Sequence, residues 1–413
     1  MSAAASPGAP RSIVVVGGGL AAGKAVSVLR EQGFDGELTL LCAEPHPPYE
    51  RPPLSKGSLA GDDPVDGAFV QPETWYDEHH VDLRLGAEAT GLDPDAHTVS
   101  AGGRQTRYDR LLLATGSRVR HLQLADDSGA PVAYLRTIED SERIKSVLEP
   151  GRTVVVVGGG WIGLEVAAAA RTRGADVVVL EALEKPLLRV LGDEVADVFV
   201  GLHRAHGVDL RTGVSVSGLE ARGGRGVVHL ADGGSVEADL VVVGVGIAPQ
   251  TALAEAAGLT VDNGVVVDEH LRASHRDVFA AGDVANAFHP TLGRHLRVEH
   301  WDNALEQGAT AARNMLGATE SYDRLPYFFT DQYDLGMEYV GSVGPDGYDD
   351  VVLRGDVEGR VFTAFWLHGG TVVAGMQAND WDAMDHVRRV VAAGHVDLSA
   401  LRDPDVALDE VAT

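Results

Sequence analysis

The chain is poor in cysteine, because Cys42 is the only one among its 413 residues. A redox-active disulfide within one chain requires two cysteines at short spacing, so that mechanism is excluded. A peroxidase or oxidase that uses a single cysteine is the remaining alternative. Cys42 lies within a predicted strand, however, and we interpret it as a small buried hydrophobic side chain.

Positive charge is also scarce, with 34 Lys and Arg against 61 Asp and Glu and a net charge of −27. Binding to nucleic acid or to an anionic membrane surface needs a basic footprint, which argues against both partners. No apolar run reaches the ~18–20 residues that span a bilayer, and the first twelve residues lack the apolar core of a signal peptide. We therefore expect a cytoplasmic protein.

Aromatic residues make up only 6% of the chain, whereas glycine is abundant, with 50 residues. This balance is typical of an α/β enzyme with many tight turns, and the length predicts two or three domains. The 16 histidines show no spacing typical of metal ligands, so no metal site is expected.

One glycine fingerprint, G-x-G-x-x-G/A, occurs twice, in IVVVGGGLAAGKAV and in VVVVGGGWIGLEVA. Each copy follows a run of β-branched residues and opens an alanine-rich stretch, which is the strand–turn–helix context of a dinucleotide site. The first glycine permits the tight turn, the second admits a pyrophosphate, and the third position lets helix and strand pack closely. The helix N-terminus then faces the phosphates. The residues of the two turns predicted to bind cofactor are Gly17, Gly19, Leu20, Ala21, Ala22, Gly158, Gly160, Trp161, Ile162 and Gly163.

An acidic residue ends the strand that follows each fingerprint: Glu44 in ELTLLCAE and Glu181 in ADVVVLEA. A carboxylate at this place accepts hydrogen bonds from ribose hydroxyls and repels a 2′-phosphate. No arginine stands beside Glu181, so the second site is predicted to bind NAD rather than NADP. Two such sites in one chain indicate two dinucleotides with electrons passing between them, and two ordinary buried turns are the alternative.

Between the fingerprints lies a proline-rich loop that also carries cations, PPYERPPLSKGSL. The paired prolines force extended or turn backbone. A surface turn explains the prolines but not the cations, whereas a loop running over a flavin explains both. Arg51 would then face the pyrophosphate and Lys56 the reactive edge of the ring, where a cation stabilises the anionic reduced flavin.

Three further segments end predicted strands in a way that is typical of ligand contact. YDRLLLATGSRVR looks like a crossing from a first domain to a second, and ADLVVVGVGIAPQT looks like the return. The third segment is VVVDEHLRASHRDVFAAGDVA, whose last strand ends in a Gly-Asp pair before a helix. Asp283 of this pair would accept a hydrogen bond from a ribityl hydroxyl or, alternatively, only cap the helix. The predicted contacts at these strand ends are Ala114, Thr115, Gly116, Gly246, Gly282 and Asp283.

Taken together, these residues resemble the two-dinucleotide flavoprotein reductases, and within them the FAD-dependent NADH:ferredoxin reductases of bacterial oxygenase systems. That group includes the ferredoxin, rubredoxin and putidaredoxin reductases. The resemblance covers nearly the whole chain, from Ile13 to about Trp381. Its specific pieces are RPPLSK, YLRTIEDSERI, VEHWDNALEQG and YFFTDQYDLGMEYVG.

The resemblance implies particular roles for several residues. Those that approach FAD are Lys56, Arg136, Asp283, the backbone at Trp301 and, at the adenine end, the backbone of Ala89. Lys56 and Glu165 form the catalytic pair, with Glu165 near the nicotinamide. The alternatives are structural: a solvated lysine, an exposed helix glutamate or one paired with an arginine, an interface ion pair for Arg136 and a core aromatic for Trp301. Many members have a tryptophan where this chain has Phe329, which puts an electron-relay role there in doubt.

The predicted fold is α/β, with two Rossmann-like dinucleotide-binding domains and a C-terminal α+β domain that contains an antiparallel sheet. The FAD domain is discontinuous, over residues 1–118 and 247–324, and the NAD domain is inserted at 119–246. Residues 325–413 alternate apolar and polar positions between Gly-rich turns before a final helical stretch, which predicts antiparallel strands and an interface domain.

The resemblance implies an enzyme that passes a hydride from NADH to FAD and then single electrons to a [2Fe–2S] ferredoxin. The ferredoxin would serve an oxygenase, with a haem-thiolate monooxygenase as one candidate. Rubredoxin, a quinone or oxygen as acceptor is an alternative, and an NADH-sensing flavoprotein with a binding role is another. A monomer or weak homodimer is expected.

Because the net charge repels an acidic ferredoxin, a local basic patch must steer docking. The candidates for this patch are Arg294, Arg297, Arg313, Arg388 and Arg389.

Overall fold

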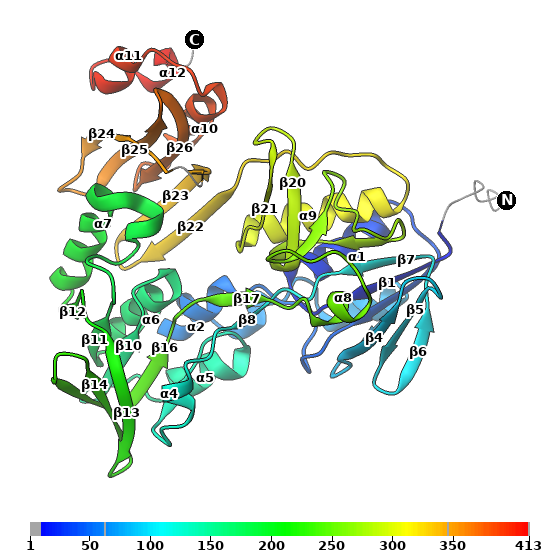
Figure 1. Cartoon of the computed structure of the whole chain (residues 1–413), viewed down its shortest axis with the longest axis horizontal. Helices are drawn as coiled ribbons and strands as arrows, with labels where there is room; N and C mark the ends of the chain where they lie inside the picture. Colours follow the sequence, from blue (N-terminus) through cyan, green and yellow to red (C-terminus); the bar gives the residue numbers. More distant parts are fainter. Residues whose placement is uncertain (1–9, 62, 345–346, 412–413) are drawn as a thin grey trace. The chain divides into compact units, whose positions relative to one another are not determined.

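The computed structural model describes residues 10–61, 63–344 and 347–411. The chain folds into two compact units, each assembled from separate stretches (Figure 1). The first unit consists of Met1–Arg51, Asp66–Arg118 and Ile247–Arg324. The second consists of Pro52–Val65, Val119–Gly246 and Leu325–Thr413. In the described part of the chain, no helix combines the length and the apolarity that crossing a bilayer requires.

A five-stranded parallel sheet forms the centre of the first unit, in the order β19-β7-β1-β2-β3. Its strands are β1 (Ser12–Val16), β2 (Glu37–Leu41), β3 (Val81–Arg84), β7 (Arg110–Leu113) and β19 (Val278–Ala280). Four residues of β1, at positions 13–16, are at most 3% exposed, as expected of a β-branched run covered on both faces. Two helices, α1 (Leu20–Glu31) and α9 (Trp301–Met315), pack against each other in this unit.

Smaller elements complete the first unit. The antiparallel strands β4 (Ala89–Asp93), β5 (Thr98–Ala101) and β6 (Arg104–Arg107) form one three-stranded sheet. A second contains β18 (Val265–Val267), β20 (Ala285–His289) and β21 (Arg294–Leu296). The strands β8 (Ser117–Val119) and β17 (Ile247–Pro249) pair where the chain leaves and re-enters the unit. Its short helices are η2 (Val65–Ala68), α3 (Glu73–Glu78), α8 (Ala252–Ala256) and η3 (Gly282–Val284).

The second unit repeats the parallel sheet, in the order β12-β11-β10-β16-β9. The strands are β9 (Val132–Ala133), β10 (Thr153–Val157), β11 (Asp176–Leu180), β12 (Asp209–Arg211) and β16 (Leu240–Val243). An antiparallel sheet of β13 (Val216–Arg222), β14 (Arg225–Leu230) and β15 (Ser235–Ala238) lies beside it. The helices are η1 (Pro52–Ser55), α2 (Gly57–Ala60), α4 (Gln123–Asp126), α5 (Ile138–Lys145), α6 (Trp161–Thr172) and α7 (Leu188–Ala205).

The C-terminal part of the second unit is a five-stranded antiparallel sheet, in the order β22-β23-β26-β25-β24 (Figure 1). Its strands are β22 (Tyr327–Gln332), β23 (Leu335–Gly341), β24 (Asp350–Asp356), β25 (Val361–His368) and β26 (Thr371–Ala378). The helices that follow are α10 (Met384–Ala393), α11 (Leu398–Arg402) and α12 (Leu408–Val411). The predicted fold class, α/β with two Rossmann-like domains and a C-terminal α+β domain that contains an antiparallel sheet, is confirmed. The three-domain boundaries stay a prediction.

Aromatic side chains join the antiparallel sheet to the helices of the second parallel layer. Phe328 on β22 stacks on Tyr339 of β23 with ring centres 4.6 Å apart, and it lies 5.1 Å from the ring of Trp161 on α6. The Trp161 ring also meets Phe199 of α7 edge-on, at 5.6 Å. The two layers of this unit therefore share one apolar core.

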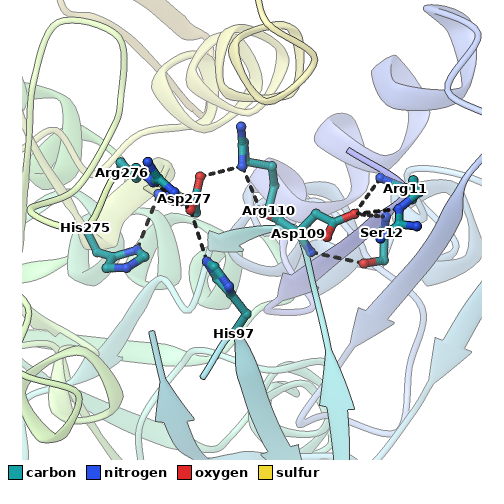
Figure 2. A network of polar contacts seen from close by, with 8 residues as sticks. All are labelled: Arg11, Ser12, His97, Asp109, Arg110, His275, Arg276 and Asp277. Carbon is teal, nitrogen blue, oxygen red and sulfur yellow. Dashed lines mark hydrogen bonds and ion pairs between the residues drawn. The ribbon is translucent and has the colours of Figure 1, made fainter. Parts of the chain in front are cut away.

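A network of charged side chains fixes the amino ends of the first unit's strands (Figure 2). The side chain of Asp277, just before β19, is 6% exposed and pairs with Arg110 at the start of β7. Its Oδ2 atom lies 3.0 Å from His97 Nε2 and 3.2 Å from Arg276 Nε. These contacts tie β19 and β7 to the β4–β5 turn.

The same network contains the one group of possible metal ligands found among the described residues, His97, His275 and Asp277. Their ligand atoms lie within 4.8 Å of one another. Both oxygens of Asp277 are already engaged by arginines, however, and a cation here would meet two guanidinium groups. We interpret the group as an internal ion-pair network.

Replacing Asp277 by asparagine should lower the free energy of unfolding by about 2–3 kcal/mol, because Arg110 loses a buried ionic partner. The matched control is Glu320→Gln, which removes a half-exposed carboxylate from Arg313 and should cost less than about 1 kcal/mol. Denaturant titration measures both values. Equal losses in the two variants would contradict the assigned weight of Asp277.

The pH dependence of the same variant has a defined sign. Burial alone would raise the pKa of Asp277, but the hydrogen bond from His97 and the charges of Arg110 and Arg276 outweigh it and lower that pKa. A lowered folded-state pKa stabilises the fold above the unfolded pKa, and the benefit is lost as pH falls through the folded value. Below about pH 4, the wild type should therefore lose unfolding free energy more steeply than Asp277→Asn.

Candidate functional site

The first fingerprint forms a narrow turn between β1 and α1 in the first unit. Gly17 has a φ of +135°, and a Cβ atom there would stand 2.0 Å from the carbonyl oxygen of Ala114. A Cβ on Gly19, by contrast, would meet nothing within 4 Å, and no side chain caps α1 at this residue. The turn thus leaves open space before a helix N-terminus, which suits a pyrophosphate.

Glu44, which follows β2, is held by two side chains of the proline-rich loop. Its Oε1 atom accepts from Arg51 Nη2 at 2.7 Å, and its Oε2 atom accepts a short hydrogen bond from the hydroxyl of Tyr49. The Arg51 guanidinium also lies over the Tyr49 ring, 5.0 Å from its centre. The structure therefore places Arg51 against the predicted ribose-binding carboxylate, and its predicted contact with the pyrophosphate stays a prediction.

The carboxyl ends of three parallel strands bring other predicted FAD contacts together. A Cβ on Gly282, which follows β19 and has a φ of +78°, would lie 3.1 Å from Cβ of Ala21 on α1. The Gly282 N–H donates to Oε1 of Gln307 on α9 at 2.9 Å. Ala114 follows β7 and its N–H donates to Val16 at the end of β1. This edge is where open α/β sheets bind ligands.

The remaining predicted FAD residues of the first unit have the following places. The hydroxyl of Thr115 donates to the Gln250 carbonyl at 2.8 Å, and Gly116 has a φ of +65°. Asp283 lies in η3, and its carbonyl accepts from Arg297 at 3.3 Å. Trp301 is the first residue of α9, and Ala89 is the first residue of β4.

The second fingerprint, in the second unit, repeats the turn between β10 and α6. A Cβ on Gly158, whose φ is +107°, would stand 2.4 Å from the Gly244 carbonyl oxygen. A Cβ on Gly163 would stand 2.1 Å from the carbonyl of Gly158, which explains the third glycine, whereas one on Gly160 would meet nothing within 4 Å. Ile162, one residue into α6, is 45% exposed beside this open space. The geometry again fits a pyrophosphate.

Backbone amides hold the carboxylate of Glu181 at the edge of this turn. Its Oε2 atom accepts from the Gly159 N–H at 2.6 Å, and Oε1 accepts from the Leu183 N–H at 2.8 Å. A 2′-phosphate on a bound dinucleotide would meet this negative charge. Gly246, at the return crossing, has a φ of +104° and its carbonyl accepts from Arg120 N at 2.9 Å.

The predicted pair of Lys56 and Glu165 is in direct contact within the second unit. Lys56 Nζ lies 2.8 Å from Glu165 Oε1, and their side chains are 17% and 3% exposed. Lys56 Nζ also lies 5.5 Å from the centre of the Phe329 ring. Arg136, which precedes α5, donates its backbone N–H to Asp140 at 2.9 Å. Lys56 is therefore an anchored cation rather than a solvated one.

Two hydroxyl groups that the sequence did not single out for this role also bind Glu165. Ser55 donates from the loop to Oε2, and Thr330 donates from β22 to Oε1 at 2.7 Å. The alternation of β22 offers a signal, because Phe328, Thr330 and Gln332 share one face of the strand. Since Phe328 packs on α6, Thr330 comes to face the same helix.

The five arginines of the predicted docking patch belong to different units, three to the first and two to the second. Arg297 pairs with Glu299, and Arg313 lies 2.6 Å from Glu320. Arg388 lies over the ring of Tyr327, 4.5 Å from its centre. Two of these charges are therefore compensated locally, and a common basic face stays a prediction.

The sole thiol lies away from any reactive role. Cys42 is fully buried beside the first fingerprint, 3.1 Å from where a Cβ on Gly18 would stand. Burial, together with the charge of Glu44, raises the pKa of the Cys42 thiol to about 12. A thiol with such a pKa is not a nucleophile at neutral pH.

Comparison with known proteins agrees with this geometry. The family model described as pyridine nucleotide-disulphide oxidoreductase matches residues 11–308, and the one described as reductase C-terminal matches 327–412. The chain belongs to the pyridine nucleotide-disulphide oxidoreductase family. Its fold and its two dinucleotide turns are those of a flavoprotein oxidoreductase.

Individual relatives are similar over almost their full length. The chain is 41% identical to the ferredoxin–NAD(+) reductase component of the anthranilate 1,2-dioxygenase system of Burkholderia cepacia, covering 96% of this chain and 98% of that protein. It is 35% identical to putidaredoxin reductase of Pseudomonas putida, covering 97% and 96%. The solved covalent complex of putidaredoxin reductase with putidaredoxin is similar in structure, with a TM-score of 0.91 at 36% identity over 96% of this chain and 97% of that one.

Glu181→Arg should shift the cofactor preference from NADH towards NADPH by about tenfold or more, because a carboxylate is replaced by a phosphate-binding cation. The ratio of kcat/KM for the two cofactors measures this. Glu184→Arg makes the same change of charge at an exposed position three residues on and serves as the control. Equal shifts in the two variants would point to overall charge and remove the assignment of Glu181 to the ribose.

Proposed function

We propose that this protein is an FAD-dependent NADH:ferredoxin reductase, which supplies single electrons to a [2Fe–2S] ferredoxin that serves an oxygenase. The proposal depends on the presence, in one chain, of two open dinucleotide turns and of a Lys56 side chain that is held by Glu165. The relatives named as ferredoxin reductase components of oxygenase systems support it. A cytoplasmic location and a monomeric or weakly dimeric state are part of the same proposal.

Under this proposal, FAD and NADH would bind in different units, each at one of the two glycine turns. The first unit would hold FAD, and the residues assigned to it are Gly17, Gly19, Glu44, Gly282 and Asp283. The second unit would hold NADH at Gly158, Gly160 and Glu181. When bound, FAD takes up a hydride as two electrons and gives the electrons up singly, which converts one kind of redox chemistry into the other.

Lys56 and Glu165 contribute charge at a fixed place. Glu165 accepts from Lys56, so the long lysine side chain is held in one position. A fixed ammonium favours the build-up of negative charge on a cofactor as it is reduced, because no solvent has to reorganise. Burial strengthens the contact that holds this ammonium, since the Glu165 side chain is 3% exposed.

The relatives support a small iron–sulfur protein as the electron acceptor, and the single cysteine excludes a disulfide within the chain as a relay. A similar protein has been solved in covalent complex with putidaredoxin, and others are named as parts of dioxygenase systems. The buried Cys42 leaves no dithiol to pass electrons through. Electrons from a bound flavin would therefore pass to an external acceptor without an internal dithiol relay.

Anaerobic stopped-flow mixing with excess NADH should bleach the flavin absorption and give a long-wavelength charge-transfer band. A second mix with a two-iron ferredoxin should restore the oxidised spectrum, whereas rubredoxin serves as the comparison acceptor. Bleaching without reoxidation by any iron protein would shift the function to a quinone, to oxygen or to NADH sensing. Absence of bleaching would refute an NADH-dependent reductase.

Lys56→Ala should lower the flavin reduction potential and slow reduction by NADH by about tenfold or more, because a preorganised cation is lost. Spectroelectrochemistry and stopped-flow absorbance measure the two quantities. Lys145→Ala, at the end of α5 in the same unit, is the control and should leave both unchanged. A normal potential and rate in Lys56→Ala would reduce this residue to a structural ion pair.

A further inference from the structure

A chain of buried hydrogen bonds runs through the second unit and ends on the carboxylate of Glu165. His203 on α7 lies 2.8 Å from Oε1 of Gln332 on β22, through its Nε2 atom. The Gln332 amide nitrogen donates to the Thr330 hydroxyl at 3.2 Å, and that hydroxyl donates to Glu165 at 2.7 Å. Each of the four residues is at most 3% exposed.

The direction of every bond in this chain is fixed by its end. The Glu165 carboxylate, paired with the Lys56 ammonium, can only accept, so Thr330 must donate its single proton to it. The Thr330 oxygen then accepts from the Gln332 NH₂ group, which turns the Gln332 oxygen towards His203. We therefore assign the His203 proton to Nε2.

The state of His203 agrees with this assignment. The pKa of His203 is lowered to about 4, and burial is the main cause. The charge of His206 also lowers this pKa, whereas the hydrogen bond with Gln332 raises it. The ring is thus neutral at physiological pH and carries one N–H. Its Nδ1 atom is buried and has no hydrogen-bond partner in the described residues, so the ring is anchored through Nε2.

The chain of hydrogen bonds joins three elements of secondary structure and can therefore hold them in fixed positions. Glu165 belongs to α6, Thr330 and Gln332 to β22, and His203 to α7. Oε1 of Glu165 receives both Lys56 and Thr330, so the hydroxyl fixes the same oxygen that holds the ammonium. Hydrogen bonds in a desolvated network strengthen and rigidify one another.

We propose that Thr330 and Gln332 are positioning residues for the electron-transfer reaction. They fix the carboxylate of Glu165 and, through it, the ammonium of Lys56, with His203 as the distant anchor. The proposal rests on the reductase function above, because it assigns the purpose of holding Lys56 to that reaction.

The test uses Thr330→Val, which keeps the shape of the side chain and removes only the hydroxyl. Thr330→Ser restores the hydroxyl, and Thr363→Val makes the same substitution at another buried threonine of the same sheet, away from the chain of bonds. Gln332→Met is a second test variant, because it removes the amide group at similar side-chain volume. It provides the same test if Thr330→Val does not fold.

The first readout is Lys56 itself, in the FAD-loaded protein. The chain has only four lysines, so the Nζ signals of ¹⁵N-lysine-labelled protein can be assigned by single Lys→Arg variants. Thr330→Val and Gln332→Met should shift and broaden the Lys56 signal and leave those of Lys24, Lys145 and Lys185 in place. Thr330→Ser should restore it, and Thr363→Val should not change it.

The second readout separates positioning from binding. The rate of flavin reduction by NADH should fall about fivefold to tenfold in Thr330→Val, as expected when a preorganised charge becomes loose. The KM for NADH should change less than about twofold, because the Glu181 contacts are intact. Thr330→Ser should regain most of the rate.

Two outcomes would overturn the proposal. One is a Lys56 signal and a reduction rate in Thr330→Val equal to those of Thr363→Val, and the other is failure of Thr330→Ser to restore them. Failure of the reductase function looks different, because the wild type itself would then not be reduced by NADH. The Lys56 signal would still report whether Thr330 and Gln332 hold the ammonium.

Discussion

The second unit depends on the cost of burying one negative charge. The Glu165 carboxylate is 3% exposed, and a buried carboxylate destabilises a fold by several kcal/mol unless donors surround it. Its donors come from the proline-rich loop, through Ser55 and Lys56, and from Thr330 on β22. Segments far apart in the sequence must therefore meet at α6 before the charge is compensated. The contacts that compensate the charge of Glu165 also hold Lys56 in a fixed position.

Parts of the site that depend on local geometry could be predicted from the sequence. The two glycine turns are examples. The strand–turn–helix context predicts a glycine with a positive φ and no room for a Cβ atom, and Gly17 and Gly158 have φ values of +135° and +107°. The fold class followed from the same repeated units. The pairing of Lys56 with Glu165 came from resemblance to a family, since nothing in their spacing indicates contact between residues 109 positions apart.

Parts that depend on tertiary packing could not be predicted. Strand alternation puts Thr330 and Gln332 on one face of β22, but it does not say which helices that face covers. His203 and Gln332 are 129 positions apart and meet only once the sheet packs on α7. Arg51 shows the same limit, because the sequence gives a cation on a stiff loop and not the direction of its side chain, which lies on Glu44.

The buried thiol of Cys42 has a practical consequence for locating the partner. A protein whose only native thiol is enclosed and stays protonated at neutral pH offers no background to thiol-directed labels. A cysteine introduced at any surface position would then be the single reactive one. Spin labels or photocrosslinkers could be moved one position at a time over both units, so the footprint of an electron acceptor could be mapped without first removing any native residue.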